Sequence, residues 1–138
     1  MKWLLDTNVL SELRKPDCDA NVRKLITGIR PDDFALSVIV LGELSKGAQL
    51  LKSGKRRREL EQWIDATHTS FAKRIVFIDT HVALAWASIA AGLQKKGRIM
   101  SMADGLIAAT ALHHGMTLVT LNVKDFKSCG VKLFNPWG

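Results

Sequence analysis

The sequence predicts an α/β protein with a mostly parallel central sheet and helices on both faces of the sheet. Short, continuous apolar segments alternate along the chain with longer segments whose apolar side chains recur at helical spacing. Turn and capping residues separate most of these segments. Parallel strands need crossovers that return the chain to the same end of the sheet, so strands alternating with helices indicate a parallel arrangement.

The N-terminal part begins with a short apolar strand, Lys2–Leu5. A helix is expected over Thr7–Arg14, because Pro16 cannot continue it. A second helix is expected over Asp19–Gly28, where apolar residues lie three and four positions apart. A Pro-Asp-Asp turn then leads into the strand Phe34–Ser37.

The middle of the chain carries the longest predicted helices. Val38–Lys52 and Lys55–Lys73 are expected to be two helices separated by a Ser-Gly pair. The β-branched run Ile75–Ile78 predicts a strand. Asp79–Lys96 predicts a long helix with an alanine-rich face, which a glycine closes.

The C-terminal part repeats the alternation. Ser101–His114 is expected to be a helix that ends at Gly115, followed by the strands Thr117–Thr120 and Val131–Phe134. The chain has no repeat, linker or low-complexity segment. We therefore expect a single domain over residues 1–138.

The composition is that of a globular protein with a substantial core. The 138 residues (15.3 kDa) are 47% apolar and 24% charged. Lys and Arg number 20 against 13 Asp and Glu, which gives a net charge of +7 with neutral histidines. This excess on a small domain favours a polyanionic partner, either nucleic acid or an anionic membrane surface.

Several classes of protein are excluded. The apolar runs are too short to span a bilayer, and no basic amphipathic helix is strong enough to support binding to a membrane surface. The N-terminus reaches a carboxylate after a few apolar residues, so we expect a cytoplasmic protein without a signal peptide. Cys18 and Cys129 form no C-x-x-C pair and are expected to be reduced thiols.

Acidic and amide side chains fall near the ends of the predicted strands. Asp6 follows the first strand, and Asn122 and Asp125 follow the fourth. Glu43 lies about two turns into the helix after the second strand, and Asp104 lies in the first turn of its helix. Sites of open α/β sheets form outside the carboxyl ends of the strands, so these groups are expected at one edge.

Each of these residues also has a structural interpretation. Asp6 can cap the helix that begins after it, and Ser101 with Asp104 resembles a capping box. Asn122 can be an ordinary turn residue. Glu43 is the least easily explained in this way, because it interrupts an apolar stretch.

Electrostatics favours a cation at such a cluster. Two carboxylates about 4 Å apart repel each other by roughly 4 kcal/mol at an effective dielectric constant near 20. Three would destabilise the fold unless a proton or a cation neutralises them. Oxygen ligands suit a hard divalent cation such as Mg²⁺, and the chemistry indicated is metal-assisted hydrolysis of a phosphodiester.

Several blocks of the sequence resemble the PIN-domain ribonucleases. They are Leu-Leu-Asp6-Thr7-Asn8-Val-Leu-Ser, Ser37-x5-Glu43-Leu, Ala103-Asp104-x-x-Ile-Ala-Ala-Thr-Ala and Leu-Val-Thr120-Leu-Asn122-x-x-Asp125-Phe126. The ending Phe134-Asn135-Pro136-Trp137 is similar to that of the VapC/FitB branch. The resemblance covers nearly the whole chain.

The resemblance implies a three-layer α/β/α sandwich and a defined activity. It implies a Mg²⁺- or Mn²⁺-dependent endoribonuclease that hydrolyses RNA with a metal-activated water and acts as the toxin of a type II toxin–antitoxin pair. A cognate VapB-like antitoxin would inhibit it. A homodimer is implied, together with a higher assembly that includes the antitoxin and contacts operator DNA only through that complex.

The resemblance also assigns the acidic residues. Asp6, Glu43 and Asp104 match the metal-binding positions of the family. Asn122 stands at a fourth catalytic position that is often aspartate, so one negative charge is absent here.

Three further polar residues match supporting positions. Asn8 and Thr120 would orient the carboxylates or a metal-bound water, a role of residues behind the ligands. Asp125 could compensate in part for Asn122, or it could cap a loop.

Cationic residues are candidates for contacts with phosphate or with the antitoxin. Lys55, Arg56 and Arg57 belong to the densest basic run, which can equally be the solvated start of a helix. Arg98 lies shortly before Asp104, from where it could reach a scissile phosphate or the antitoxin.

Two other functions fit the same residues. A FitB-like non-catalytic regulatory module would bind DNA only with an antitoxin-type partner, whose basic side chain would enter the acidic pocket. A DNA-cleaving nuclease would use the same chemistry, but we would expect it to carry additional binding elements. Growth arrest that substitution of Asp104 relieves would favour a nuclease over the regulatory module.

Overall fold

A computed structural model describes residues 1–138 and contains one five-stranded sheet of order β3-β2-β1-β4-β5. The strands are β1 (Trp3–Leu5), β2 (Phe34–Ser37), β3 (Ile75–Val76), β4 (Thr117–Val119) and β5 (Leu133–Phe134). Every neighbouring pair is parallel. The predicted α/β class is confirmed, and the sheet is parallel throughout rather than mostly parallel.

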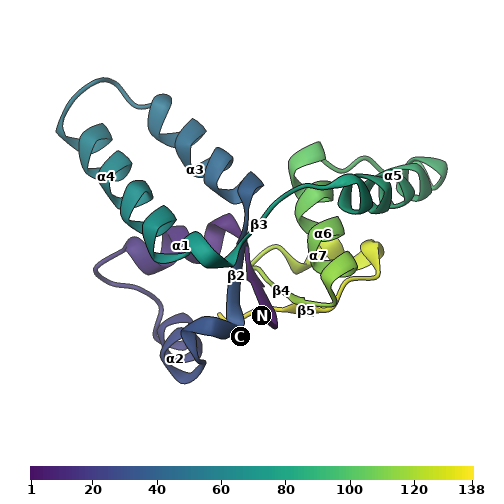
Figure 1. Ribbon diagram of the computed structural model, residues 1–138, viewed down its shortest axis with the longest axis horizontal. Helices are drawn as coiled ribbons and strands as arrows, with labels where there is room; N and C mark the ends of the chain where they lie inside the picture. Colours follow the sequence, from purple (N-terminus) through teal and green to yellow (C-terminus); the bar gives the residue numbers. More distant parts are fainter.

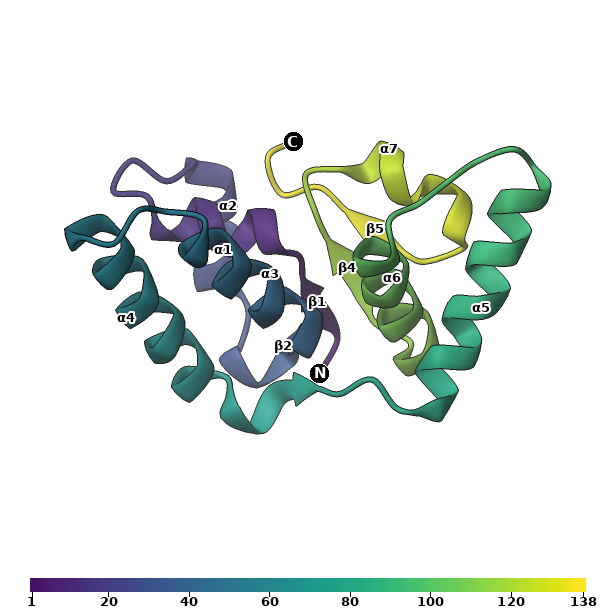
Figure 2. The same cartoon turned by 90° about the horizontal axis from the view of Figure 1, so that it is seen from above.

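Helices cover both faces of this sheet. They are α1 (Thr7–Arg14), α2 (Ala20–Gly28), α3 (Val38–Gln49), α4 (Lys55–Ser70), α5 (Thr80–Lys95), α6 (Met102–His114) and α7 (Val123–Phe126). Figures 1 and 2 show α1 to α4 grouped on one side and α5 to α7 on the other. This division follows from the right-handed crossovers between parallel strands. The chain crosses the sheet in one direction from β1 to β3 and in the opposite direction from β3 to β5, so the connecting helices lie on opposite faces.

Side-chain caps explain where many of these helices begin. Asp6, Asp19 and Asp79 each accept a hydrogen bond from a backbone N–H in the first turn of the following helix. Ser37 does the same for α3. The glycine at position 115 adopts a left-handed conformation that ends α6.

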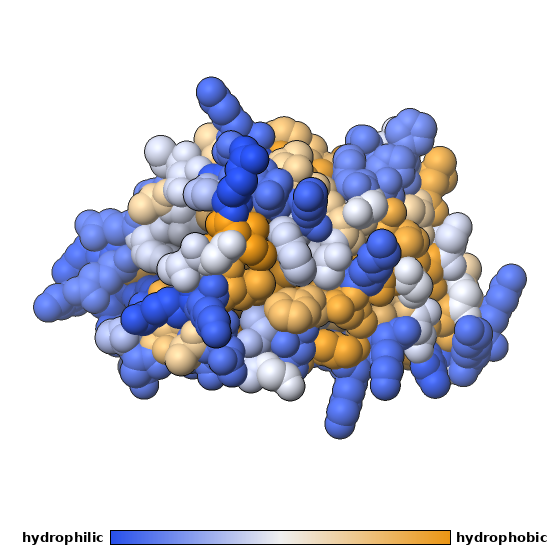
Figure 3. All heavy atoms as spheres, turned by 90° about the horizontal axis from the view of Figure 1, so that it is seen from below, coloured by the Kyte–Doolittle hydropathy of each residue, from blue (hydrophilic) through white to orange (hydrophobic).

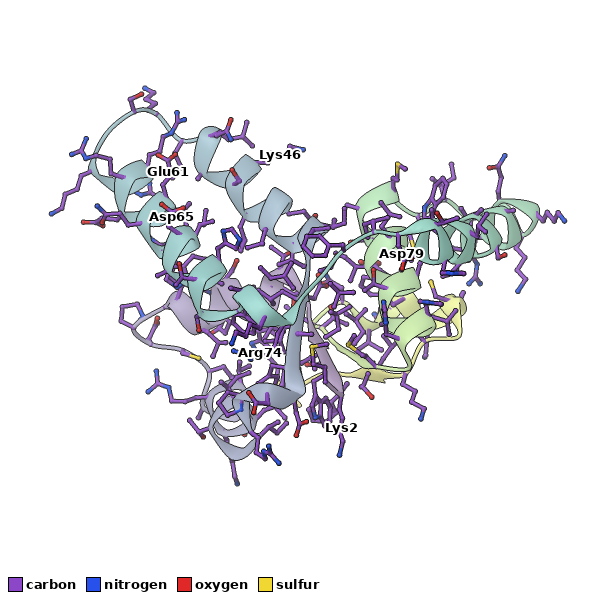
Figure 4. All side chains as sticks on the ribbon, in the orientation of Figure 1. Lys2, Lys46, Glu61, Asp65, Arg74 and Asp79 are labelled. Atoms are coloured by element: carbon purple, nitrogen blue, oxygen red, sulfur yellow. The ribbon has the colours of Figure 1, made fainter.

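The core lies between the sheet and the two helical groups. Leu4, Leu36 and Leu118 from the three central strands are completely buried. Arg74 lies at the start of β3 (Figure 4) and donates hydrogen bonds to the carbonyls of Phe34 (3.3 Å) and Ser70 (2.9 Å). These bonds join the end of α4 to β2, the neighbour of the edge strand β3. No helix combines the length and the hydropathy needed to cross a membrane.

The predicted elements differ from the observed ones mainly at their ends. The strands expected over Ile75–Ile78 and Val131–Phe134 are each two residues long. The helix expected over Val38–Lys52 ends at Gln49, and the one expected over Lys55–Lys73 ends at Ser70. Helix α7 was not predicted, because its four residues are too few to show a period and no side chain caps it.

Candidate functional site

Asp6 directly follows β1, where the strand order of the sheet reverses: β2 and β3 lie on one side of β1, and β4 and β5 on the other. Its backbone N–H donates to the carbonyl of Val119 (3.0 Å), which fixes it between the ends of β1 and β4. Ligands of open α/β sheets bind in the crevice at such a switch point. The side chain is only 4% exposed, and its Oδ1 accepts from the Thr7 N–H (2.8 Å). The structural interpretation of Asp6 as a helix cap is therefore confirmed.

A network of neutral side chains holds the other oxygen of Asp6. The Thr120 hydroxyl donates to Oδ2 of Asp6 (2.8 Å), and the Asn8 amide lies 3.4 Å from the same oxygen. Asn8 also accepts from the Leu121 N–H (3.2 Å), and Thr120 accepts from the Asn122 N–H (3.0 Å). The carboxylate of Asp6 is therefore held in one orientation by bonds from the start of α1 and from Thr120, the residue that follows β4.

Glu43 and Asp104 reach the same region from two helices. Oε1 of Glu43, on α3, accepts from the Thr7 hydroxyl (2.8 Å). Asp104 lies in the first turn of α6, where its N–H donates to Oγ of Ser101 (3.1 Å). The capping role expected for Ser101 is confirmed, and it fixes the turn that carries the Asp104 side chain.

The four predicted catalytic residues, together with Asn8, line one open pocket. We call it the acidic pocket; its volume is about 420 Å³. Its other lining residues are Thr7, Ser11, Glu12, Lys15, Leu121 and Trp137. Asp125 and Arg98 instead line an adjoining pocket, which shares Asp104 with the acidic pocket.

Burial and mutual repulsion raise the pKa values of two acids of this pocket. Burial raises the pKa of Asp6 above its ordinary value of 3.8, and the charge of Glu43 adds to this rise, while hydrogen bonds from Thr120 and Thr7 oppose it. Burial also raises the pKa of Asp104, and the charge of Asp6 raises it further. The carboxyls of Asp6, Glu43 and Asp104 therefore form a chain of electrostatic coupling.

The donor set of the acidic pocket fits a hard divalent cation. Its acidic residues are Asp6, Glu12, Glu43 and Asp104, its only cationic residue is Lys15, and it contains no sulfur or imidazole ligand. Within the structure, no three acidic, histidine or cysteine side chains lie close enough together to hold one ion. The carboxylates thus face one space without converging on one point.

Sequence reasoning missed the part of the pocket that α1 supplies. Thr7 and Ser11 lie four residues apart and therefore on one face of this helix, and Lys15 directly follows its last residue. Lys15 pairs with Glu12 at 3.2 Å, so the only cation of the pocket already has a partner. The spacing of Thr7 and Ser11 was visible in the sequence, but nothing in the sequence indicated that Thr7 contacts Glu43.

The basic run at the start of α4 lies outside the acidic pocket. Lys55 pairs with Glu59 (3.8 Å) and Arg57 with Glu61 (3.3 Å), one helical turn along α4, where Figure 4 labels Glu61. Arg56 lines a third pocket, which shares Thr7, Ser11 and Glu43 with the acidic pocket. Part of the positive charge of this run is therefore offset within its own helix.

Comparisons with known proteins identify the family of the chain. The sequence profile of the PIN domain matches residues 3–131. The chain is 36% identical to toxin FitB of Neisseria gonorrhoeae, over 97% of both chains. It is 33% identical to VapC ribonuclease Y4jK of Sinorhizobium fredii, over 97% of this chain and 96% of that protein. A solved structure of FitAB bound to a DNA fragment matches with a TM-score of 0.90 and 36% identity, covering 99% of this chain and 96% of that one.

The fold and the site thus define a small, fully parallel α/β protein with an acidic pocket at the switch point of its sheet. The chain belongs to the PIN-domain family, and its similarity to FitB and VapC proteins places it in that branch of the family.

Proposed function

We propose that this protein is a cytoplasmic, Mg²⁺-dependent endoribonuclease, able to use Mn²⁺, that acts as the toxin of a type II toxin–antitoxin pair. One observation carries the proposal: Asp6, Glu43, Asp104 and Asn122 come from four separate parts of the chain and line one pocket. The similarity to Y4jK, a VapC ribonuclease, supports RNA as the substrate.

Asp6, Glu43 and Asp104 are the proposed metal ligands, in part through metal-bound waters, because the three carboxylates do not converge on one point. A divalent cation bound there would lower the pKa of water and offset charge on the phosphate. Thr120 and Asn8 keep the Asp6 carboxylate oriented, and Thr7 holds one oxygen of Glu43. Asn122 is an exposed lining residue of the pocket, and its amide can bind a phosphate oxygen without adding negative charge.

The proposed protein partner is a VapB-like antitoxin that inhibits the toxin. The similar FitAB structure is that of a complex bound to DNA. It supports the proposal that this chain, as a homodimer, joins a larger assembly with its antitoxin and reaches operator DNA only through that assembly.

Cleavage of RNA tests the proposed activity directly. The wild type should cleave RNA with Mg²⁺ or Mn²⁺ and stop when EDTA is added, and Asp6→Asn should lower the rate at least about 100-fold. Asp65→Asn is the matched control, because Asp65 is an exposed aspartate of α4 outside the pocket (Figure 4). Equal cleavage by the wild type and Asp6→Asn would overturn the proposed site.

A FitB-like regulatory module is the second candidate. Similarity to FitB and the missing charge at Asn122 favour it. Expression in cells separates the two functions: growth arrest that Asp104→Asn relieves supports the nuclease. Unaffected growth, combined with DNA binding that needs an antitoxin, supports the regulatory module. Comparing RNA and DNA cleavage at matched salt tests a DNA nuclease.

A further inference from the structure

A second cavity of about 440 Å³ adjoins the acidic pocket, and we call it the flanking pocket. The end of α5, the connection to α6 and the segment around α7 line it. Figure 2 shows that this connection passes over the side of the molecule that carries α7. Arg98 in the connection donates a hydrogen bond to Oγ of Ser128, so the two segments are joined across the pocket. Asp104 lines both pockets and forms the boundary between them.

The flanking pocket differs from the acidic pocket in the charges that it offers. Arg98 and Lys124 are both exposed, and neither forms an ion pair within the chain. The hydrogen-bond partner of Arg98 is a neutral hydroxyl. In the acidic pocket, by contrast, the only cation is paired with Glu12. Of the two pockets, the flanking pocket therefore holds the unpaired cations that can contact a phosphate.

The other lining groups suit the rest of a nucleotide. Ile99 is 97% exposed and offers an aliphatic surface to the face of a base. The hydroxyls of Ser101 and Ser128 can bond a ribose hydroxyl, and the carboxylate of Asp125 can accept from a base amino group. Leu93 and Met100 supply the apolar part of the lining.

We propose that the flanking pocket binds the nucleotide next to the scissile phosphodiester of a single-stranded RNA. Arg98 and Lys124 hold its phosphate, and Ile99 packs against its base. The proposal rests on the ribonuclease function proposed above. Because Asp104 lines both pockets, a strand that fills the flanking pocket has its neighbouring phosphodiester beside a proposed metal ligand. Apart from Asp104, the residues of this pocket position the substrate and take no part in the chemical step.

Steady-state kinetics on a short single-stranded oligoribonucleotide tests this role. Arg98→Gln and Lys124→Gln should each raise KM about tenfold, with kcat within about twofold of the wild type. Each should also flatten the dependence of log affinity on log salt by about 0.7. Ile99→Ser should raise KM without changing the salt dependence.

The matched controls are Lys95→Gln and Lys132→Gln, which remove exposed cations outside both pockets. A second readout avoids cleavage altogether: the affinity of a fluorescent oligoribonucleotide for Asp6→Asn, with and without Arg98→Gln. The Arg98→Gln substitution should weaken this binding about tenfold.

The outcomes separate this proposal from the proposed function. If Asp6→Asn abolishes cleavage but the flanking-pocket variants match the lysine controls, the subsite is wrong and the ribonuclease function stands. If the wild type cleaves no RNA but Arg98→Gln weakens binding of the oligoribonucleotide, the ribonuclease function is wrong and the flanking pocket is an RNA-binding site only. If that binding is also unchanged, both proposals are wrong. Variants that weaken inhibition by the antitoxin but leave RNA binding unchanged would assign the pocket to the antitoxin and overturn the proposal.

Discussion

The Asp6 carboxylate is buried without a cationic partner, and this single residue explains much of the chemistry of the site. Its bonds come from neutral donors of Thr7, Thr120 and Asn8. Neutral donors orient a carboxylate and leave its charge in place, whereas an arginine or a lysine would neutralise it. The negative charge of Asp6 therefore remains available for an external cation.

Replacing Thr120 with valine should destabilise the protein by about 1–3 kcal/mol, because Asp6 loses a 2.8 Å bond and Thr120 is fully buried. Urea unfolding measures the change. Thr110→Val is the matched control: Thr110 is equally buried, but its hydroxyl bonds only a carbonyl of its own helix. Equal losses in both variants would contradict a special role for the bond to Asp6.

The raised pKa of Asp104 predicts that Asp104→Asn stabilises the folded protein, by an amount that depends on pH. In the folded protein the pKa of Asp104 lies above its ordinary value of 3.8, so the folded state binds the proton more tightly than the unfolded state. The ionised Asp104 carboxylate therefore destabilises the folded state. This destabilisation has its full size above the pKa of Asp104 in the folded protein, and it disappears as the pH falls toward 3.8.

Asp104→Asn, without divalent ions, should therefore melt at a higher temperature than the wild type near pH 7 and lose this advantage as the pH falls toward about 4. Thermal unfolding across that range measures it. Asp65→Asn corrects for the general effect of removing one acidic charge from this chain. An advantage that is constant with pH would contradict the assigned cause.

At the scale of elements, α5 and α6 approach so closely that only a glycine fits between them. A Cβ at Gly105 would lie 2.7 Å from Cδ1 and 2.8 Å from Nε1 of Trp86. Gly105 directly follows Asp104 in the first turns of α6. The contact with the indole therefore sets the position of the helix end that carries the Asp104 carboxylate.

Gly105→Ala should cost about 1–3 kcal/mol, because the indole or the start of α6 must move. It should also weaken the binding of Mn²⁺, measured by calorimetry. Gly42→Ala is the control: Gly42 lies beside Glu43 in a helix, and no atom lies within 4 Å of its added Cβ. That variant should be neutral or more stable by up to about 1 kcal/mol. If both variants behave alike, the contact does not position Asp104.

The order of elements was largely predictable, because each strand is a compact apolar run and many of the helices begin at a residue that caps them. The contacts between distant elements were less so. The sequence indicated that Asp6 and Thr120 each lie at the end of a strand, but not that these two strands are neighbours or that the hydroxyl of Thr7 holds Glu43. The position of Asp125 could not be predicted either, because it depends on the short helix α7. This helix places the carboxylate at the flanking pocket.

On the scale of the whole molecule, the net charge of +7 conceals a separation of charge. Asp6, Glu12, Glu43 and Asp104 are gathered in one pocket. The remaining surface is therefore more basic than the net value suggests. Figure 3 shows one face on which hydrophilic side chains project around apolar ones.

Mg²⁺ or Mn²⁺ should raise the melting temperature of the wild type, because an ion that binds only the folded state stabilises it by about 2.7 kcal/mol at 100 times its Kd. Thermal unfolding with increasing ion concentration measures this effect, and Asp6→Asn should lose most of it. Equal increases in the wild type and the variant would mean that the ions bind elsewhere.

The bond between Asp6 and Thr120 also has a consequence for the timing of synthesis. It joins residues separated by 114 positions, and β4 must lie beside β1 before it can form. During synthesis, Asp6 emerges from the ribosome long before Thr120. The acidic pocket is therefore completed only when translation is nearly finished, so a nascent or prematurely terminated chain lacks it.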